Sequence, residues 1–196
     1  MNKMVKINCF KKEISYIKDT NLKKDLKTLI GILPDYFFEV PASSTGKYHP
    51  SFALGDGGLV RHTKVAVRMG YELLSNNIVG CKFNDHDKDL ILISLLLHDG
   101  LKSGLEHEKY TRFDHPLLVS KYIMDNKDKL LMDIDDVRKV CSMIESHMGE
   151  WTYDSYHKRE VLPRPRTAEQ RFVHMCDFLA SRKFLNVSFV DNDIDN

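Results

Sequence analysis

The 196-residue sequence has almost no net charge, because 29 lysine and arginine residues face 28 aspartate and glutamate residues, a net of +1. This balance excludes the strong positive field by which many proteins bind duplex DNA. Charged residues make up 29% and hydrophobic residues 42%, so a disordered or fibrous chain is excluded as well. The length favours a single domain that folds without disulfides.

Cysteine is scarce and widely spaced. The four cysteines are Cys9, Cys81, Cys141 and Cys176, and no two of them form a CxxC pair. Their spacing therefore does not predict a zinc ribbon. We expect reduced, partly buried thiols, as in a cytoplasmic protein.

Long apolar runs are also missing. The longest one covers residues 90–97 and is interrupted by Ser94, whereas about 18–20 apolar residues are needed to span a bilayer. The first nineteen residues contain neither a long apolar stretch nor a cleavage site, so we expect no secretory signal. These absences predict a cytoplasmic location and no membrane partner.

Helical periodicity is what the sequence does have. Leu22, Leu26, Leu29 and Leu33 recur at spacings of three and four, which predicts an amphipathic helix over residues 21–33. Similar patterns predict further helices over residues 59–74, 85–99, 115–124, 134–147 and 167–185. The segments 34–58 and 149–166 are expected to be loops. Because no convincing set of alternating strands appears, we predict an all-α fold.

Histidine is abundant, with nine residues, and it is the commonest metal ligand as well as a general acid or base near neutral pH. Several histidines stand where the helical pattern calls for an apolar residue. His62 interrupts an apolar stripe, and His147 lies at the end of another. The pair His98–Asp99 ends the most hydrophobic predicted helix, and His115 begins the next one.

Asp99 and Asp177 are the most informative of these polar residues, because both fall on apolar helix faces or ends. A buried carboxylate must be paired or bind a metal. Four imidazoles and two carboxylates could hold one or two divalent cations, namely Mn, Fe, Co, Ni or Zn, and less comfortably Mg. A carboxylate beside a histidine could bridge two metals, and a bridging water would then lose a proton near neutral pH.

Each residue alone also has a purely structural explanation. A lone histidine on an apolar face is usually a hydrogen-bonded core residue, and His115 could simply cap a helix. Asp177 could pair with Arg171 or Arg182. The adjacent His98–Asp99 is harder to explain in this way, and the whole ordered series is far less easily produced by chance than any single member.

Five segments resemble successive motifs of the HD superfamily of metal-dependent phosphohydrolases: GGLVRHTKVA, LLLHDGLKSG, FDHPLLVSKYI, IESHMGEW and HMCDFLASR. The resemblance covers roughly residues 57–186 and is closest to the HD domain of bacterial 3′–5′ exoribonucleases and to stand-alone HD proteins of bacteria and their phages. It implies an HD-domain helical bundle over 57–186, with an N-terminal helix and loop over 1–56 packed on it and a C-terminal tail over 187–196. The location it implies is the cytoplasm of a bacterial or phage-infected host cell.

The resemblance also implies a dinuclear metal site. The first metal would be held by His62, His98, Asp99 and Asp177. His115 and His147 match the extra histidines of dinuclear members, with Asp99 bridging. Lys102 matches the lysine that contacts the phosphate, so the catalytic residues implied are Asp99 and Lys102. One departure is Gly100–Leu101, where the glycine precedes the apolar residue while Lys102 keeps its spacing from Asp99.

The function implied is hydrolysis of a phosphoester in a nucleotide or a short single-stranded oligonucleotide by a metal-bridging hydroxide. The substrate-binding residues expected are Lys102, Trp151, Arg164 and Arg166. Trp151 could stack on a base or, equally, anchor its loop. His174 is expected to support the ligands, whereas His49, His86 and His157 are expected at the surface.

Two alternatives remain open at this point: a di-iron HD-fold oxygenase with the same ligands, and a non-catalytic metal-binding regulatory module. The sequence does not decide between a monomer and an oligomer.

Overall fold

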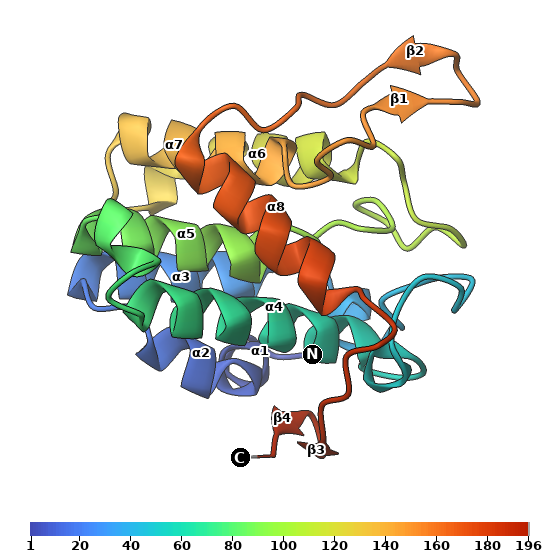
Figure 1. Ribbon diagram of the computed structural model, residues 1–196, viewed down its shortest axis with the longest axis horizontal. Coiled ribbons are helices and arrows are strands. Elements are labelled where there is room, and N and C mark those ends of the chain that lie inside the picture. Colours follow the sequence, from blue (N-terminus) through green and yellow to red (C-terminus); the bar gives the residue numbers. More distant parts are fainter. Residues whose placement is uncertain (196) are drawn as a thin grey trace.

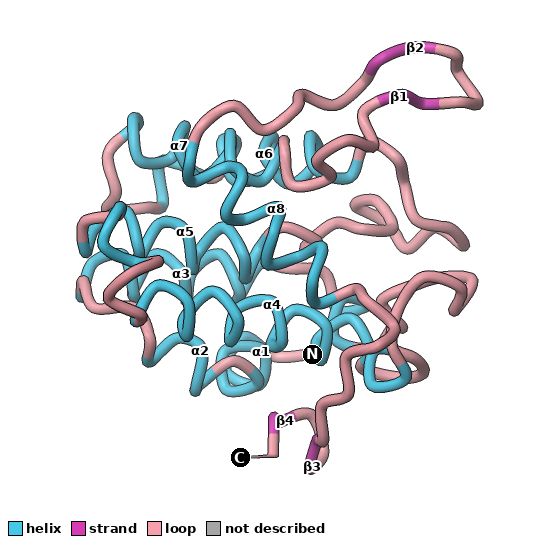
Figure 2. Tube along the Cα trace, in the orientation of Figure 1, coloured by secondary structure: helices cyan, strands magenta, loops and turns pink. Residues whose placement is uncertain are grey.

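The computed structural model describes residues 1–195 as a bundle of eight α-helices with short 3-10 turns and two small β-hairpins (Figures 1 and 2). The helices are α1 (Lys3–Cys9), α2 (Lys11–Ser15), α3 (Thr20–Ile32), α4 (Gly58–Ser75), α5 (Asp85–Leu97), α6 (His115–Asp125), α7 (Ile134–Glu145) and α8 (Ala168–Ala180). The strands β1 (Tyr153–Asp154) and β2 (Arg159–Glu160) form one antiparallel hairpin, and β3 (Phe189–Val190) and β4 (Asp193–Ile194) form the other. The all-α prediction is confirmed.

Helix α5 is the centre of the bundle. It lies between α4 and α7, and α8 crosses in front of it (Figure 1). Every residue from Asp89 to Leu97 is buried, as expected for a helix that is apolar on all sides. The helix begins after Asn84, whose side chain accepts a hydrogen bond from the backbone N–H of Asp87 at 2.8 Å. This cap fixes where the helix begins, and the helix ends at Leu97, directly before the His98–Asp99 pair.

Two buried carboxylates that the sequence did not single out tie loops to the bundle. Asp25 accepts hydrogen bonds from two backbone N–H groups in the loop before α7. Asp89 does the same for two N–H groups in the turn before α3. Both carboxylates are thus satisfied by the backbone, which is a structural role.

The structure differs from the sequence-based expectation in several segments. Residues 149–166 include the hairpin β1–β2, and the predicted tail 187–196 includes the hairpin β3–β4. The two hairpin turns place Lys158 and Asp191 at positive φ, 51° and 54°. Strands of two residues are too short to show alternation, so periodicity could not reveal them. The last helix ends at Ala180, earlier than predicted, and α1 and α2 were not predicted at all.

The C-terminal hairpin packs against α4. Asp193 forms an ion pair with the buried Lys64 of that helix. Phe189 lies against Phe52, with ring centroids 5.6 Å apart. These contacts fasten the C-terminal hairpin to the helix that carries His62 and to the segment just before that helix.

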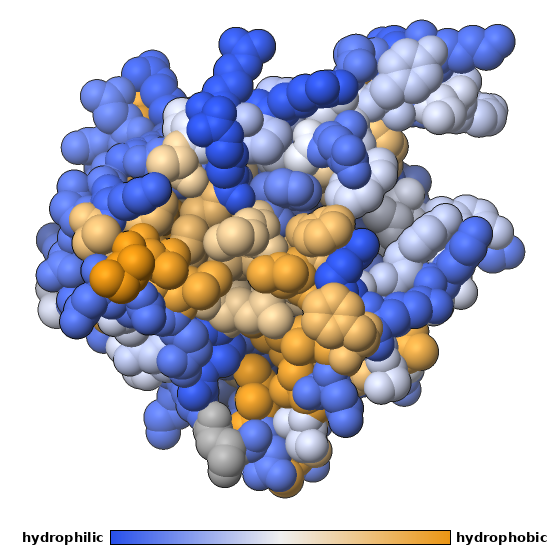
Figure 3. All heavy atoms as spheres, viewed as in Figure 1, coloured by the Kyte–Doolittle hydropathy of each residue, from blue (hydrophilic) through white to orange (hydrophobic). Residues whose placement is uncertain are grey.

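Within residues 1–195, no helix combines the length and the apolar character that crossing a membrane requires. The face crossed by α8 is apolar along its middle and hydrophilic around its edge (Figure 3). Helix α8 therefore covers the core while leaving some apolar side chains, such as Met175, exposed to solvent.

Candidate metal centre

The six predicted ligands lie together inside the bundle, although they come from separate segments of the chain. His62 belongs to α4, His98 and Asp99 follow the last turn of α5, His115 begins α6, His147 follows α7, and Asp177 belongs to α8. The first five are buried, and the side chain of Asp177 is 18% exposed. The fold thus brings together residues up to 115 positions apart in the sequence.

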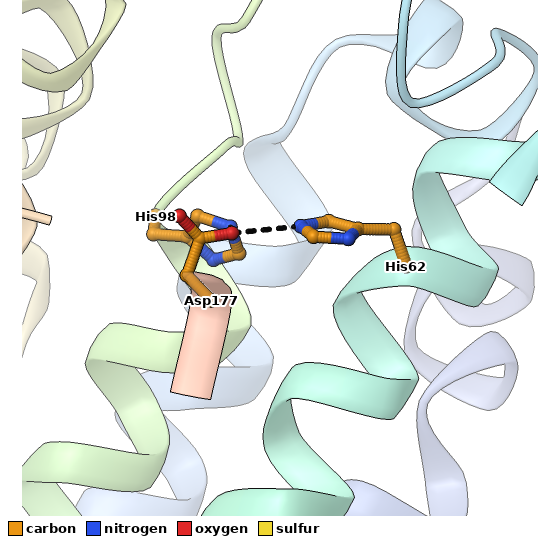
Figure 4. Close-up of side chains that lie close together, drawn as sticks. All are labelled: His62, His98 and Asp177. Atoms are coloured by element: carbon orange, nitrogen blue, oxygen red, sulfur yellow. Dashed lines mark hydrogen bonds and ion pairs between the residues drawn. The ribbon is translucent and has the colours of Figure 1, made fainter. Parts of the chain in front are cut away.

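One half of the cluster is formed by His62, His98 and Asp177 (Figure 4). The Nε2 atom of His62 lies 3.0 Å from Oδ1 of Asp177. The Nε2 atom of His98 lies 3.4 Å from the same oxygen and 3.4 Å from Oδ2 of Asp99. Two imidazoles and two carboxylates therefore surround one small volume.

The other half is formed by His115 and His147 around the second oxygen of Asp99. Oδ1 of Asp99 lies 3.0 Å from Nε2 of His115 and 3.9 Å from Nε2 of His147. The two Nε2 atoms are 3.3 Å apart. Because Oδ2 faces the first half and Oδ1 the second, Asp99 stands between the two.

Two structural explanations for single residues do not hold in the described part of the chain. Asp177 pairs with histidines, and neither Arg171 nor Arg182 forms an ion pair with it among residues 1–195. His115 is the first residue inside α6, and its ring faces Asp99. Both residues therefore belong to the cluster.

The orientation of three imidazoles is set by backbone carbonyls. In each ring Nδ1 bonds the carbonyl oxygen three residues earlier, with His98 bonding Leu95 at 2.6 Å, His115 bonding Arg112 at 2.7 Å and His147 bonding Ile144 at 2.7 Å. The carbonyls at a helix C-terminus lack amide partners, so a histidine just after α5 or α7 finds an acceptor there. A ring that donates from Nδ1 presents Nε2 to the cluster, as ligating histidines do.

These donor groups fit a cation. Two neutral rings that donate from Nδ1 would direct the Nε2 lone pairs of His115 and His147 at each other across 3.3 Å. The Nε2 atom of His98 is buried and lies 3.4 Å from an oxygen of each carboxylate, without the geometry of a hydrogen bond. In two groups, His62–His98–Asp177 and His98–Asp99–His147, one ligand atom from each residue lies within 4.8 Å of the others. A mixture of imidazole and carboxylate suits Mn, Fe, Co, Ni or Zn.

The charges of the cluster are strongly coupled. Burial alone would raise the pKa values of Asp99 and Asp177, but Lys102 and His98 hold the pKa of Asp99 well below its usual range, and His62 and His98 do so for Asp177. Burial would lower the pKa of His98, yet the two carboxylates outweigh it and raise that pKa to about 10. Burial and the nearby His98 lower the pKa of His147 to about 3. In the metal-free cluster at neutral pH, protonated His98 therefore lies between the two carboxylates.

Lys102 lies at the cluster, in contact with a ligand. Its Nζ donates to Oδ2 of Asp99 at 2.6 Å, and the side chain is 12% exposed. A tight turn joins Asp99 to Lys102, in which the backbone N–H of Lys102 donates to the carbonyl oxygen of Asp99 at 3.0 Å. The ammonium therefore supplies a positive charge next to the oxygen of Asp99 that a cation would bind.

Trp151 is anchored by an aromatic neighbour. Its ring stacks on Phe178, with centroids 5.9 Å apart and planes 18° apart. The guanidinium carbon of Arg182 lies 3.9 Å from the centroid of the Phe178 ring. Phe178 follows Asp177 in α8, and Trp151 itself is 45% exposed.

Arg164 and Arg166 are not brought to the cluster. Both are exposed and precede α8, of which Asp177 is the tenth residue. At about 1.5 Å per residue, the start of the helix lies roughly 13 Å from Asp177 along the axis. A rigid helix keeps these arginines away from the ligand at its other end.

His49 approaches the cluster from the loop before α4, although the sequence predicted it at the surface. Its ring meets that of His62 edge to face, with centroids 4.9 Å apart. Burial, followed by the effect of His62, lowers the pKa of His49 to about 3. No periodicity marks a loop residue, so its identity as histidine was the only signal.

Three other histidines behave as expected. His86 and His157 are exposed and pair with Asp136 at 2.8 Å and Asp154 at 2.6 Å. His174 supports the cluster by bonding the carbonyl oxygen of His147 at 2.7 Å.

The His174 ring explains a glycine. A Cβ on Gly149 would lie 2.1 Å from the His174 ring, and Gly149 also has a positive φ of 67°. Only glycine lets the chain after His147 pass this ring.

No family model, curated protein or solved structure matches this chain. Function must therefore be inferred from the chemistry of the site itself.

Proposed function

We propose that this chain is a metal-dependent phosphohydrolase that cleaves a phosphoester of a nucleotide or a short oligonucleotide. The observation that carries the proposal is the buried convergence of four imidazole Nε2 atoms on two carboxylates, with Asp99 between the two halves. The similarity of the surrounding motifs to those of the HD superfamily supports the type of reaction.

The proposed ligands divide between two cations. His62, His98, Asp99 and Asp177 would hold the first, and His115 and His147 would hold the second together with the other oxygen of Asp99. When bound, two such cations would lower the pKa of a water ligand and neutralise charge on a phosphoryl group. The carbonyl contacts of Nδ1 keep three of the imidazoles oriented for this task.

Lys102 would act on the phosphoryl group. In the structure its ammonium donates a hydrogen bond to Oδ2 of Asp99. The ammonium must leave this oxygen when a cation binds there. The four-carbon stem lets the ammonium move a short distance without leaving the site. From there it would stabilise negative charge that develops on the phosphoryl oxygens.

The test is turnover and metal content of the Asp99→Asn variant, which changes the charge of the shared ligand with little change in its shape. We expect the purified wild-type protein to bind one or two transition metals and to hydrolyse bis(p-nitrophenyl) phosphate with Mn²⁺, Co²⁺ or Mg²⁺. The Asp99→Asn variant should lose activity and metal. Fewer than about 0.2 metal ions per chain in the reconstituted wild type would overturn the proposal, as would oxygen consumption without phosphoester cleavage.

A further inference from the structure

A surface hollow of about 590 Å³ lies next to the segment that carries His115. One wall is the loop between α5 and α6 together with the first turn of α6, and the other is the β1–β2 hairpin with the residues just after it. The hairpin extends beyond the helices, above that loop (Figure 1). The volume is within the ordinary range of small-molecule sites.

Both walls continue from segments that carry proposed ligands. Arg112 lines the hollow, and its carbonyl oxygen is bonded by Nδ1 of His115 at 2.7 Å. Asp114, also in the wall, directly precedes His115. The hairpin begins at Tyr153, shortly after His147. A ligand whose phosphate lies at the His115–His147 half therefore has the hollow within its reach.

The hollow contains apolar side chains that the core does not use. Phe113, Leu117 and Val161 line it, and none of them belongs to the hydrophobic core of residues 1–195 or packs against it. Phe113 is half-buried. An aromatic ring placed in this way offers a face on which a flat heterocycle can stack.

The charged groups favour a neutral occupant. Three carboxylates and two guanidinium groups line the hollow, so it does not attract additional phosphates. Arg112 already donates to Asp114 at 2.8 and 2.9 Å and to Glu108 at 2.9 Å. Arg159 forms no ion pair or side-chain hydrogen bond in the part of the chain that the structure describes. Its planar set of donors is free to bind adjacent acceptors on the edge of a ring.

We propose that this hollow binds the nucleobase of the substrate, with Phe113 stacking on the base and Arg159 donating to its edge. The inference rests on the proposed phosphohydrolase function, because the cluster must hold the phosphate. A nucleobase has the required properties: it is planar and carries no charge at neutral pH, and guanine presents the adjacent acceptors O6 and N7 on its edge.

The test compares two non-hydrolysable probes, a nucleoside 5′-phosphonate and the matching ribose phosphonate without a base. Their affinities are measured by titration calorimetry on the Mn²⁺-loaded protein. We expect the wild type to bind the nucleoside probe at least fivefold more tightly, since stacking on one aromatic ring contributes about fivefold to 150-fold in affinity. Phe113→Ala and Arg159→Ala should reduce this preference and leave the affinity for the ribose probe unchanged.

Two matched variants serve as controls, Phe184→Ala and Arg138→Ala. Phe184 lies beyond α8 and is 80% exposed, and Arg138 is exposed on α7. Both variants should keep the full preference for the nucleoside probe. If Phe113→Ala keeps it as well, or weakens both probes equally, the hollow is not the base site.

Failure of this inference is distinguishable from failure of the proposed function. A wild type that hydrolyses bis(p-nitrophenyl) phosphate but binds both phosphonates equally overturns the base site and leaves the phosphohydrolase standing. A wild type that neither binds metal nor cleaves the ester overturns both.

Discussion

Metal binding should stabilise the whole bundle, because the proposed ligands come from α4, α6, α8 and the segments that follow α5 and α7. A cation bound to these groups connects segments that otherwise meet only through packing. The unfolded chain offers no preformed site, so binding free energy adds to the free energy of unfolding. The perturbation is removal of metal with EDTA, followed by addition of Mn²⁺.

The size of the effect follows from mass action. At a free Mn²⁺ concentration about 100 times the Kd, binding to the folded state adds about 2.7 kcal/mol to the free energy of unfolding. For a chain of this length, each kcal/mol raises Tm by about 2–4 °C. The expected rise in Tm is therefore about 5–11 °C, and it should increase further with Mn²⁺ concentration.

The assay is thermal unfolding followed by circular dichroism, with and without Mn²⁺, for the wild type and two variants. Asp177→Asn removes a charged ligand from the first half and should abolish most of the Mn²⁺-dependent shift. His86→Gln is the matched control, because His86 also forms a close histidine–aspartate pair, with Asp136 at 2.8 Å, but on the surface. Its shift should equal that of the wild type. Comparing shifts removes any effect of either substitution on the metal-free fold.

Two results would refute this reasoning. One is a shift below about 1 °C at millimolar Mn²⁺ in a wild-type protein that unfolds cooperatively. The other is an Asp177→Asn variant that keeps the full shift, since the first half of the cluster would then not be a metal site.

Three further predictions concern individual groups. His147→Ala should remove one of two metals while the first remains, as measured by elemental analysis; two retained metals with full activity would leave no dinuclear site. Lys102→Ala should lower kcat by about 10²–10³ while metal content is unchanged, the loss typical of one donor to a developing oxyanion; wild-type turnover would show that the ammonium has no catalytic role. Because the pKa of His98 is raised to about 10, the metal-free protein carries a proton there at pH 7, which must leave before the ring can bind a metal. Mn²⁺ affinity should therefore rise about tenfold per pH unit between pH 7 and 9, with proton release detectable by calorimetry in two buffers, and a flat profile would contradict the assignment.

The helices were predictable where local chemistry decides the structure. The apolar spacing in residues 21–33 corresponds to helix α3 of the structure. The central position of α5 followed from its apolar character on every side. Segments fixed by long-range contacts were not predictable. Arg61, for example, donates to Oδ1 of Asn192, 131 positions away, at 2.7 Å, and no sequence pattern reveals such a bond.

The cluster was predictable in its membership but not in its details. Histidines at helix ends or on apolar stripes, together with carboxylates on apolar faces or ends, identified six residues that the fold brings together. Sequence spacing could not show that Lys102 bonds Asp99, because that depends on the turn between them. Nor could it place His49, which reaches His62 through loop geometry, or show that Arg164 lies at the far end of α8.

Stability alone does not account for this cluster. Buried ionic groups can often be replaced by apolar residues of similar volume without loss of stability. The buried carboxylates of Asp25 and Asp89 do have a structural role, because backbone N–H groups satisfy them and they hold loops in place. Asp99 and Asp177 instead face the Nε2 atoms of imidazoles from separate segments. An arrangement that also brings the Nε2 atoms of His115 and His147 within 3.3 Å of each other in the interior is poorly suited to holding helices together and well suited to holding a cation.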